Sequence, residues 1–167
     1  RRGIRQTTVR EIADGAGVLS GSLYHYFEAK DAIAAAILRG YVAAVRVRYS
    51  SAVAQGKNPR ESLDEVVLGS LEVAAAYPQA TTIYQNEIPY LGEHPEYEDV
   101  IADAARNQQV WLDIIEAGRT DHSFRSDIQT LVFHRMIRDA VWLCVRWYTP
   151  TAEYPTPRLA EDVISVF

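Results

Sequence analysis

The stretch that most constrains this chain runs from Thr8 to Lys30, where two short helices must meet at a glycine turn. Thr8 is a strong N-cap residue, and Glu11 stands three residues later, where its carboxylate can reach back and close a capping box. We therefore expect a helix to begin at Val9. Gly17 can supply the left-handed backbone conformation that a tight turn between helices needs. The spacing predicts a helix-turn-helix.

The second helix of this motif should present small and hydrogen-bonding side chains. Ser20 is expected to cap it, and it should end near Phe27, with Leu23, Tyr26 and Phe27 turned inward. The outer face then holds Ser20, Gly21, Ser22, Tyr24 and His25. Such a face fits the major groove of DNA, where bulky side chains would hold a helix away from the bases. No Arg or Lys lies in this helix, so hydroxyl, imidazole and backbone groups should read the bases.

Residues that flank the motif are candidates for the DNA phosphates. Thr7 and Thr8 lie where the positive end of a helix can receive a phosphate, and Lys30 opens the following helix. The net charge of -5 is divided unevenly: residues 1–30 hold five Arg and Lys against three Asp and Glu, and the remainder holds twelve against nineteen. An acidic body and a basic end would orient the molecule on a duplex.

The run TTVREIADGAGVLSGSLYHYFEAKDAI resembles the N-terminal domain of the TetR-type transcriptional repressors. The shared features are a Thr-rich helix start, an Ala-Gly-Val turn, a Gly-Ser-Leu-Tyr recognition helix and a Lys-Asp pair opening the next helix. The resemblance implies a DNA-binding domain at residues 1–30 and a helical ligand-binding and dimerisation domain at residues 31–167. Family members place one more helix before this motif. Only RRGIRQ precedes it here, so we expect the DNA-binding domain to be incomplete.

Apolar residues at helical spacing continue through the rest of the chain, which predicts an all-α fold. The expected helices span about 30–54, 59–76, 79–91, 96–117, 126–147 and 157–167. Asn58 and Pro59 should start the second of these, and Gly118 should end the fourth. Ser126 or Asp127 should cap the fifth. Pro89 and the GEHPEY segment that follows should form a loop.

A candidate ligand site lies on the predicted helix 126–147. Arg138 and Trp142 stand four residues apart and share a face of a helix whose inner side is otherwise apolar. A buried arginine needs an anionic partner. Arg138 therefore pairs with Asp139, Glu87 or Glu116, or it binds a ligand. Further candidates for the cavity, each of which is alternatively a core residue, are Tyr84, Gln85, Trp111 and, nearer the exposed end of the helix, Arg146.

The residues SGSLYHYF and RDAVWLCVRWYTP also resemble the branch of this family that controls steroid-ring degradation and senses acyl-CoA thioesters. This resemblance implies a small hydrophobic effector, such as an acyl-CoA thioester of steroid or lipid catabolism, whose polar part would meet Arg138 and Arg146. The implied function is a repressor that ligand releases from its operator, although no residue fixes whether ligand releases or promotes DNA binding. The alternative is a DNA-binding dimer without an effector.

We expect a homodimer on a near-palindromic operator. One short recognition helix reads only a few base pairs, and two-fold pairing doubles the contacts. The last two long helices carry more apolar surface than one body can easily bury, and this surface should form the interface: Val132, Met136, Leu143, Trp147, Leu159, Val163, Ile164 and Phe167.

Other classes of function find little support. The sequence contains no HExxH motif, no Cys/His ligand spacing, no nucleophile elbow and no phosphate-binding glycine loop, so we expect neither an enzyme nor a metal or cofactor. A catalytic pair of Glu87 and His134 is the remote alternative. No run of 18 apolar residues and no signal-like N-terminus is present, which predicts a cytoplasmic protein without a membrane partner.

Overall fold

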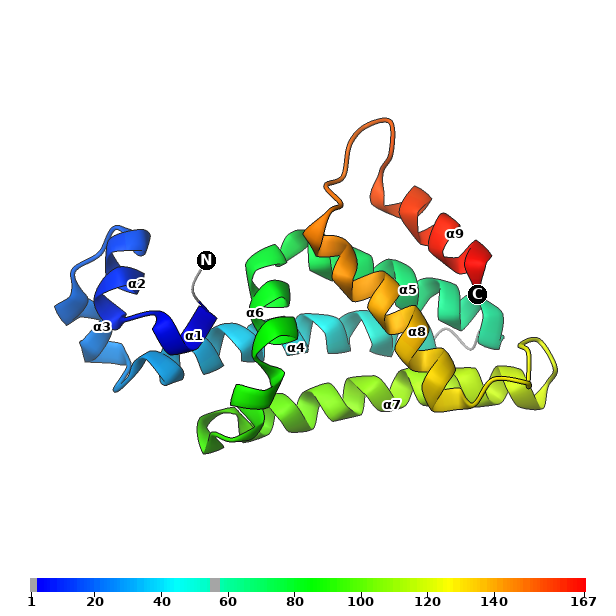
Figure 1. The fold of residues 1–167 in the computed structure, drawn as a ribbon, viewed down its shortest axis with the longest axis horizontal. Helices are drawn as coiled ribbons and strands as arrows, with labels where there is room; N and C mark the ends of the chain where they lie inside the picture. The colour runs from blue at the N-terminus through cyan, green and yellow to red at the C-terminus, as the bar shows by residue number, and fades with distance from the viewer. Residues whose placement is uncertain (1–2, 55–57) are drawn as a thin grey trace.

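The computed structural model describes residues 3–54 and 58–167, and every regular element in these two ranges is a helix. A small head, formed by α1 (Gly3–Gln6), α2 (Val9–Ala16) and α3 (Ser20–Tyr26), lies at one end of the molecule (Figure 1). The long helix α4 (Lys30–Ala54) leads from the head into a larger body (Figure 1). The predicted all-α fold is confirmed.

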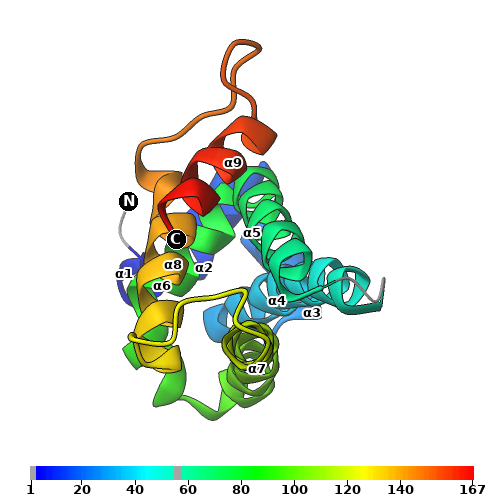
Figure 2. The same cartoon turned by 90° about the vertical axis from the view of Figure 1, so that its right-hand side faces the viewer.

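The body is a helical bundle centred on α4, α5 (Pro59–Ala76) and α7 (Glu98–Thr120), which pack on one another. Between α5 and α7, the chain forms α6 (Pro78–Gly92) and the short 3-10 helix η1 (Pro95–Tyr97), which contact α4 near the head. The helix α8 (Thr130–Trp142) packs on α7 and continues as the 3-10 helix η2 (Leu143–Arg146). The last helix, α9 (Thr156–Val166), covers α5 (Figure 2).

The core runs along α4 and α5. Leu38 and Val42 of α4 and Leu63, Val66 and Val67 of α5 are all buried. As the sequence predicts, Asn58 caps α5, with its Oδ1 accepting from the Glu61 amide at 2.9 Å, and Pro59 is the first helical residue. None of the described helices is long and apolar enough to cross a membrane.

One residue expected in a loop is helical, and one helix continues past the residue expected to end it. Pro89 lies inside α6, not in a loop, and the turn that follows it is held by the buried side chains of Tyr90 and Leu91. Likewise, α7 runs through Gly118 to Thr120. Gly118 is needed for packing rather than for a turn, because a Cβ at this position would collide with the ring of Phe124. Tertiary packing overrides the local signal in both places.

The helix predicted at 126–147 is shorter at both ends. Neither Ser126 nor Asp127 caps it, because α8 begins only at Thr130, with Gln129 at the N-cap position. The Asp127 carboxylate instead accepts hydrogen bonds from the Arg125 guanidinium at 2.7 and 2.8 Å. At the other end, α8 changes into η2 after Trp142. This change alters the direction of every side chain that follows.

Candidate functional site

The head contains the predicted helix-turn-helix. The Glu11 amide donates to Thr8 Oγ1 at 3.2 Å and the Thr8 amide donates to Glu11 Oε2 at 2.8 Å, so the capping box is complete. α2 begins at Val9 as expected, and Gly17 ends it with a φ of 69° in the left-handed region. The local signals of the sequence therefore position the second helix of the motif.

The recognition helix α3 presents the expected face to solvent. Gly21, Ser22, Tyr24 and His25 are exposed, and Ser20 is half-buried. Two details differ from the prediction. The N-cap position is Leu19, which makes no side-chain capping bond, and Ser20 is the first helical residue. Tyr26 is 78% exposed rather than turned inward, because Leu23 and Phe27 alone occupy the narrow inner face of this two-turn helix.

The flanking candidates Thr7 and Lys30 make contacts within the protein. Thr7 Oγ1 donates to the Gly3 carbonyl at 2.6 Å. Lys30 Nζ donates to the carbonyls of Ile4 and Arg5, both at 3.0 Å. Lys30, at the start of α4, thus provides a hydrogen-bond donor for two carbonyl groups at the end of α1. Thr7 lies in the head, and Lys30 is the first residue of α4. Contact of Thr7, Thr8 and Lys30 with DNA stays a prediction.

A cluster of hydrogen bonds, which we call the latch, ties the start of α4 to α6 and η1. The Asp31 carboxylate accepts from the Tyr90 hydroxyl at 2.8 Å and from the Tyr97 hydroxyl at 2.7 Å. Burial and this carboxylate raise the pKa of Tyr90 to about 12 and raise that of Tyr97 as well, so both hydroxyls stay protonated and donate. Asp31, Tyr90 and Tyr97 make up the latch.

The residues around the latch extend this connection to α1. The Arg5 guanidinium lies over the Tyr90 ring, 5.0 Å from its centroid, and 3.8 Å from the Glu93 carboxylate. Gly3 adopts a φ of 66°, and a side chain there would collide with the Glu87 carboxylate. The C-terminal half of α6 therefore touches the head directly.

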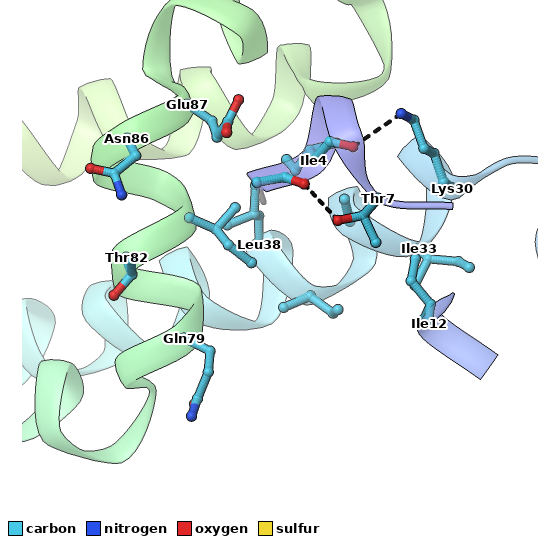
Figure 3. A pocket seen from close by; sticks show the side chains of 14 residues that line it. Ile4, Thr7, Ile12, Lys30, Ile33, Leu38, Gln79, Thr82, Asn86 and Glu87 are labelled. Atoms are coloured by element: carbon cyan, nitrogen blue, oxygen red, sulfur yellow. Dashed lines mark hydrogen bonds between the residues drawn. The ribbon is translucent and has the colours of Figure 1, made fainter. Parts of the chain in front are cut away.

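A junction cavity of about 500 Å³ lies between head and body (Figure 3). Ile4, Thr7 and Ile12 of the head face α4 and the Thr82, Asn86 and Glu87 side of α6 (Figure 3). Its shape must change whenever the head moves against α6, because the two form opposite walls. No ligand is predicted here from the sequence. A polar stripe at helical spacing on α6 could have revealed it: Gln79, Thr82 and Asn86.

A second cavity, the body cavity, of about 230 Å³, lies between α4, α6, α7 and α8. It gathers the predicted ligand residues from three helices: Tyr84, Gln85, Trp111, Arg138 and Trp142. Arg146 does not join them. It is exposed on η2, where Nη2 donates to Asn86 Oδ1 at 3.1 Å, because the 3-10 turn takes it off the face of Arg138. Ligand binding by these residues stays a prediction.

Arg138 sits at the mouth of the body cavity rather than in its depth. Its side chain is 38% exposed, so the expected burial is wrong. Of the alternatives for its partner, the structure contains the Asp139 pair: Nε and Nη2 donate to Asp139 Oδ1 at 2.9 and 2.6 Å. Glu87 lines the junction cavity, and Glu116 accepts from the Thr130 hydroxyl at 2.6 Å. An exposed ion pair contributes only about 0–1 kcal/mol, so a ligand can replace Asp139.

Trp111 forms the rigid back of the body cavity. Its Nε1–H donates to the Tyr49 hydroxyl at 2.8 Å, and Tyr49 in turn contacts Ser70 Oγ at 2.7 Å. Since Ser70 donates its own proton to the Val66 carbonyl at 2.7 Å, Tyr49 must be the donor to Ser70. Trp111 Nε1, the Tyr49 hydroxyl and Ser70 Oγ therefore all have hydrogen-bond partners, so Trp111 offers a ligand its ring and not its N–H.

Two buried polar residues of the body cavity were missed as ligand candidates, Asn107 and His134. Burial, assisted by Arg138 and Arg135, lowers the pKa of His134 to about 4, so its ring is neutral at pH 7. The signal was available, because His134 precedes Arg138 by four residues on the same face of α8. The catalytic pair of Glu87 and His134 is wrong, since the two line different cavities.

Comparison with known proteins agrees with this geometry. Residues 1–37 match the family described as bacterial regulatory proteins, tetR family, and residues 56–167 match the tetracyclin repressor-like C-terminal domain. The HTH-type transcriptional repressor KstR2 of Rhodococcus jostii (strain RHA1) is 38% identical over 165 residues, covering 99% of this chain and 81% of that protein.

Solved structures share the whole fold. The ketosteroid transcriptional regulator KstR2 of Mycobacterium tuberculosis is 34% identical, with a TM-score of 0.89 over 99% of this chain and 84% of that one. AibR, solved in complex with isovaleryl coenzyme A and operator DNA, has the same fold at 16% identity, with a TM-score of 0.80 over 99% and 89% of the two chains. Because the family matches span the head and the body, this chain belongs to the TetR family of bacterial transcriptional regulators, which are not enzymes.

Proposed function

We propose that this protein is a ligand-responsive repressor that reads a near-palindromic operator as a dimer and is released when a small hydrophobic effector enters the body cavity. One observation carries the proposal. The single helix α6 lines the body cavity with Tyr84 and Gln85 and, within the next two turns, contacts α1 of the head, where Glu87 lies against Gly3 and Arg5 lies over the Tyr90 ring. A ligand that displaces α6 would therefore act on the head.

The DNA-reading surface is the exposed face of α3, with Tyr24 and His25 at its centre and Ser20, Gly21 and Ser22 beside them. Tyr24 is 59% exposed on this face. Hydroxyl and imidazole groups can hydrogen-bond base edges, and the positive charges of the head supply phosphate attraction. We assign residues 1–30 to DNA binding and residues 31–167 to sensing and pairing, with the cytoplasm as the site of action.

Dimerisation is best supported by the outer face of α8. Leu131, Val132 and Met136 are 43–52% exposed on it, and Trp147 is 68% exposed just beyond. Leu159 was expected in the dimer interface. This prediction is wrong, because Leu159 is buried where α9 packs on α5. The remaining exposed patch suits a two-fold contact in which each α8 meets its copy.

The body cavity suits the acyl part of an acyl-CoA thioester. At about 230 Å³, it can hold a small ring system, whereas a nucleotide would have to stay outside, near Arg138. Tyr41, Tyr84 and Trp142 provide flat walls, with Tyr41 meeting Trp142 edge-on at 6.0 Å. The names of the relatives, ketosteroid regulators, and the coenzyme A thioester bound by AibR support this class of effector.

Transmission would use two routes. The first is α4, which passes from the body cavity to the head as a continuous helix. The second is the latch, which binds the first turn of α4 to α6 and η1. An effector that fits one position of α6 better than another shifts the population of head spacings, and only one spacing matches successive major grooves.

The test is an operator-binding titration at fixed salt with the full-length protein and a panel of acyl-CoA thioesters, their free acids and steroids. Wild type is compared with Arg138→Met. Arg106→Met is the matched control, because it breaks a similar surface pair with Asp103. We expect a thioester to release wild type and Arg106→Met, and Arg138→Met to bind DNA but ignore the thioester.

The alternative is a dimer without an effector, and the Asp139 partner of Arg138 is the observation that favours it. In that case no compound would change the operator affinity of wild type, and Arg138→Met would differ from it only in stability. That result would remove the sensing half of the proposal and leave the DNA-binding half intact.

A further inference from the structure

The turn before the recognition helix α3 ends in an apolar side chain that the fold leaves in solvent. Leu19 is 79% exposed, and Val18 beside it is 43% exposed. Single exposed hydrophobic residues are common on protein surfaces and need no explanation by themselves. Leu19 differs because of its position, directly before α3 and next to the exposed face that contains Ser22, Tyr24 and His25. It therefore borders the surface proposed to read DNA.

Leu19 also occupies a position at which a polar residue would stabilise the helix. It is the N-cap of α3, with extended backbone angles (φ -75°, ψ 139°), and its side chain makes no capping hydrogen bond. A serine at an N-cap accepts from a backbone amide of the first turn, whereas leucine cannot and is among the least favourable residues there. Helix stability therefore does not account for a leucine at this position.

The first turn of α3 places Leu19 on the side that would face the bases. The Ser22 amide donates to the Leu19 carbonyl at 2.9 Å, so the two residues lie one turn apart on the same side of the helix. In helix-turn-helix proteins, the N-terminal residues of the recognition helix contact the base edges. Gly21 and Ser22 are small and exposed, so this turn can approach the floor of the major groove closely.

The major groove offers an apolar side chain one matching group. The base edges present hydrogen-bond donors and acceptors there, and thymine adds its 5-methyl group. Contact between this methyl group and the Leu19 side chain removes apolar surface of both partners from water, which stabilises the complex. A donor or acceptor in the same place would lose its hydration without gaining a hydrogen bond, because leucine provides none.

We infer that Leu19 contacts the 5-methyl group of a thymine in each half of the operator and determines specificity for thymine at that position. This inference deepens the DNA-binding part of the proposed function and rests on it, but it requires neither an effector nor the body cavity. It adds an apolar contact to the hydrogen bonds expected from the base-reading side chains: Ser20, Ser22, Tyr24 and His25.

The test replaces each thymine of the operator by deoxyuridine, at symmetric positions in both halves, because uracil lacks only the 5-methyl group. The operator is first located by footprinting on the region upstream of the gene, and fluorescence anisotropy at fixed salt gives the dissociation constants. For wild type, uracil at one position should weaken binding about fourfold for each half-site, the effect expected of one buried methyl group. Leu19→Ala should bind the thymine operator more weakly and be insensitive to uracil at that position.

A second variant, Leu19→Ser, separates contact with DNA from a structural role. It should lose the response to uracil as Leu19→Ala does, yet raise the midpoint of urea denaturation, because serine provides the missing cap. The control Val47→Ala shortens a similarly exposed side chain on α4 and should bind and respond as wild type does.

Equal responses of wild type and Leu19→Ala at every thymine would overturn the inference. A lower denaturation midpoint for Leu19→Ser would also overturn it, because Leu19 would then be a structural residue. In both cases wild type still binds the operator, so the DNA-binding part of the proposed function would stand. Failure of wild type to bind any upstream DNA would remove both.

Discussion

The recognition helix α3 and the helix α8 perform the two halves of the proposed function, and they are built in opposite ways. None of the residues of α3 is buried, whereas α8 buries Phe133, His134, Ile137, Val141 and Trp142. The outer side chains of α3, such as Tyr24 and His25, are exposed and free to meet DNA. Side chains of α8 serve the core and the cavity at once. Mutations in the head should therefore change function without changing stability, whereas mutations in the body should change both.

The largest difference between body and head should be the loss of stability caused by matched aromatic substitutions. Trp111→Ala removes a ring that is 2% exposed and leaves the Tyr49 hydroxyl without its donor, so we expect a loss of about 3–5 kcal/mol in the free energy of unfolding. Tyr26→Ala, in the head, should change it by less than about 0.5 kcal/mol. Urea denaturation measures both. Comparable losses would show that the head is not the independent surface described above.

The pH dependence of stability should distinguish the two regions next. Folding lowers the pKa of His134 from an ordinary 6.5 to about 4, so the unfolded chain takes up a proton first as the pH falls. Stability is fully present above about pH 6.5 and is lost between 6.5 and 4, by at most about 3 kcal/mol. His134→Gln should flatten this decline. The matched exposed substitution His25→Gln should leave the wild-type decline in place in urea titrations at pH 7 and 4.5.

Weakening the latch should uncouple the DNA-binding head from the ligand-binding body. Tyr97→Phe removes one hydroxyl from Asp31, and Tyr154→Phe removes a comparable bond to Asp162, 2.7 Å long and within the α9 region. Each should cost about 1–2 kcal/mol of stability. Only Tyr97→Phe should reduce the effector-induced change in operator affinity, by severalfold. An equal effect of both variants would mean that the latch is merely structural.

The smallest change in stability should accompany a large change in DNA binding. Tyr24→Ala should stay within about 0.5 kcal/mol of wild type in unfolding and lower operator affinity by about tenfold. Val47→Ala, at a similarly exposed site on α4, is the control and should change neither quantity. Fluorescence anisotropy with labelled operator measures the affinity. Normal binding by Tyr24→Ala would remove this side chain from the reading surface.

The same contrast explains what the sequence could predict. The capping box of Thr8 and Glu11, the turn at Gly17 and the start of α5 at Pro59 depend on residues a few positions apart, and the structure has them as predicted. The loop expected at Pro89 and the helix stop expected at Gly118 were wrong, because burial of Tyr90 and the fit of Phe124 are contacts that local rules do not contain.

The candidate site divides in the same way. The stripe of Arg138 and Trp142 is a local pattern, and the structure places both on the body cavity. Arg146 does not share the face of Arg138 and Trp142, because α8 changes into the 3-10 helix η2. No nearby residue predicts this change. The latch joins Asp31 to Tyr90 and Tyr97, about sixty residues away, and could be found only in the folded chain.

The central claim is that occupation of the body cavity changes the spacing of the two heads. The most direct test is a spin-label distance measurement on the dimer, with labels at Glu28→Cys, an exposed position between α3 and α4, in a Cys144→Ala background. We expect one narrow distance in the operator complex and a different one after a bound effector has been verified by calorimetry. Identical distance distributions with and without bound effector would contradict the account.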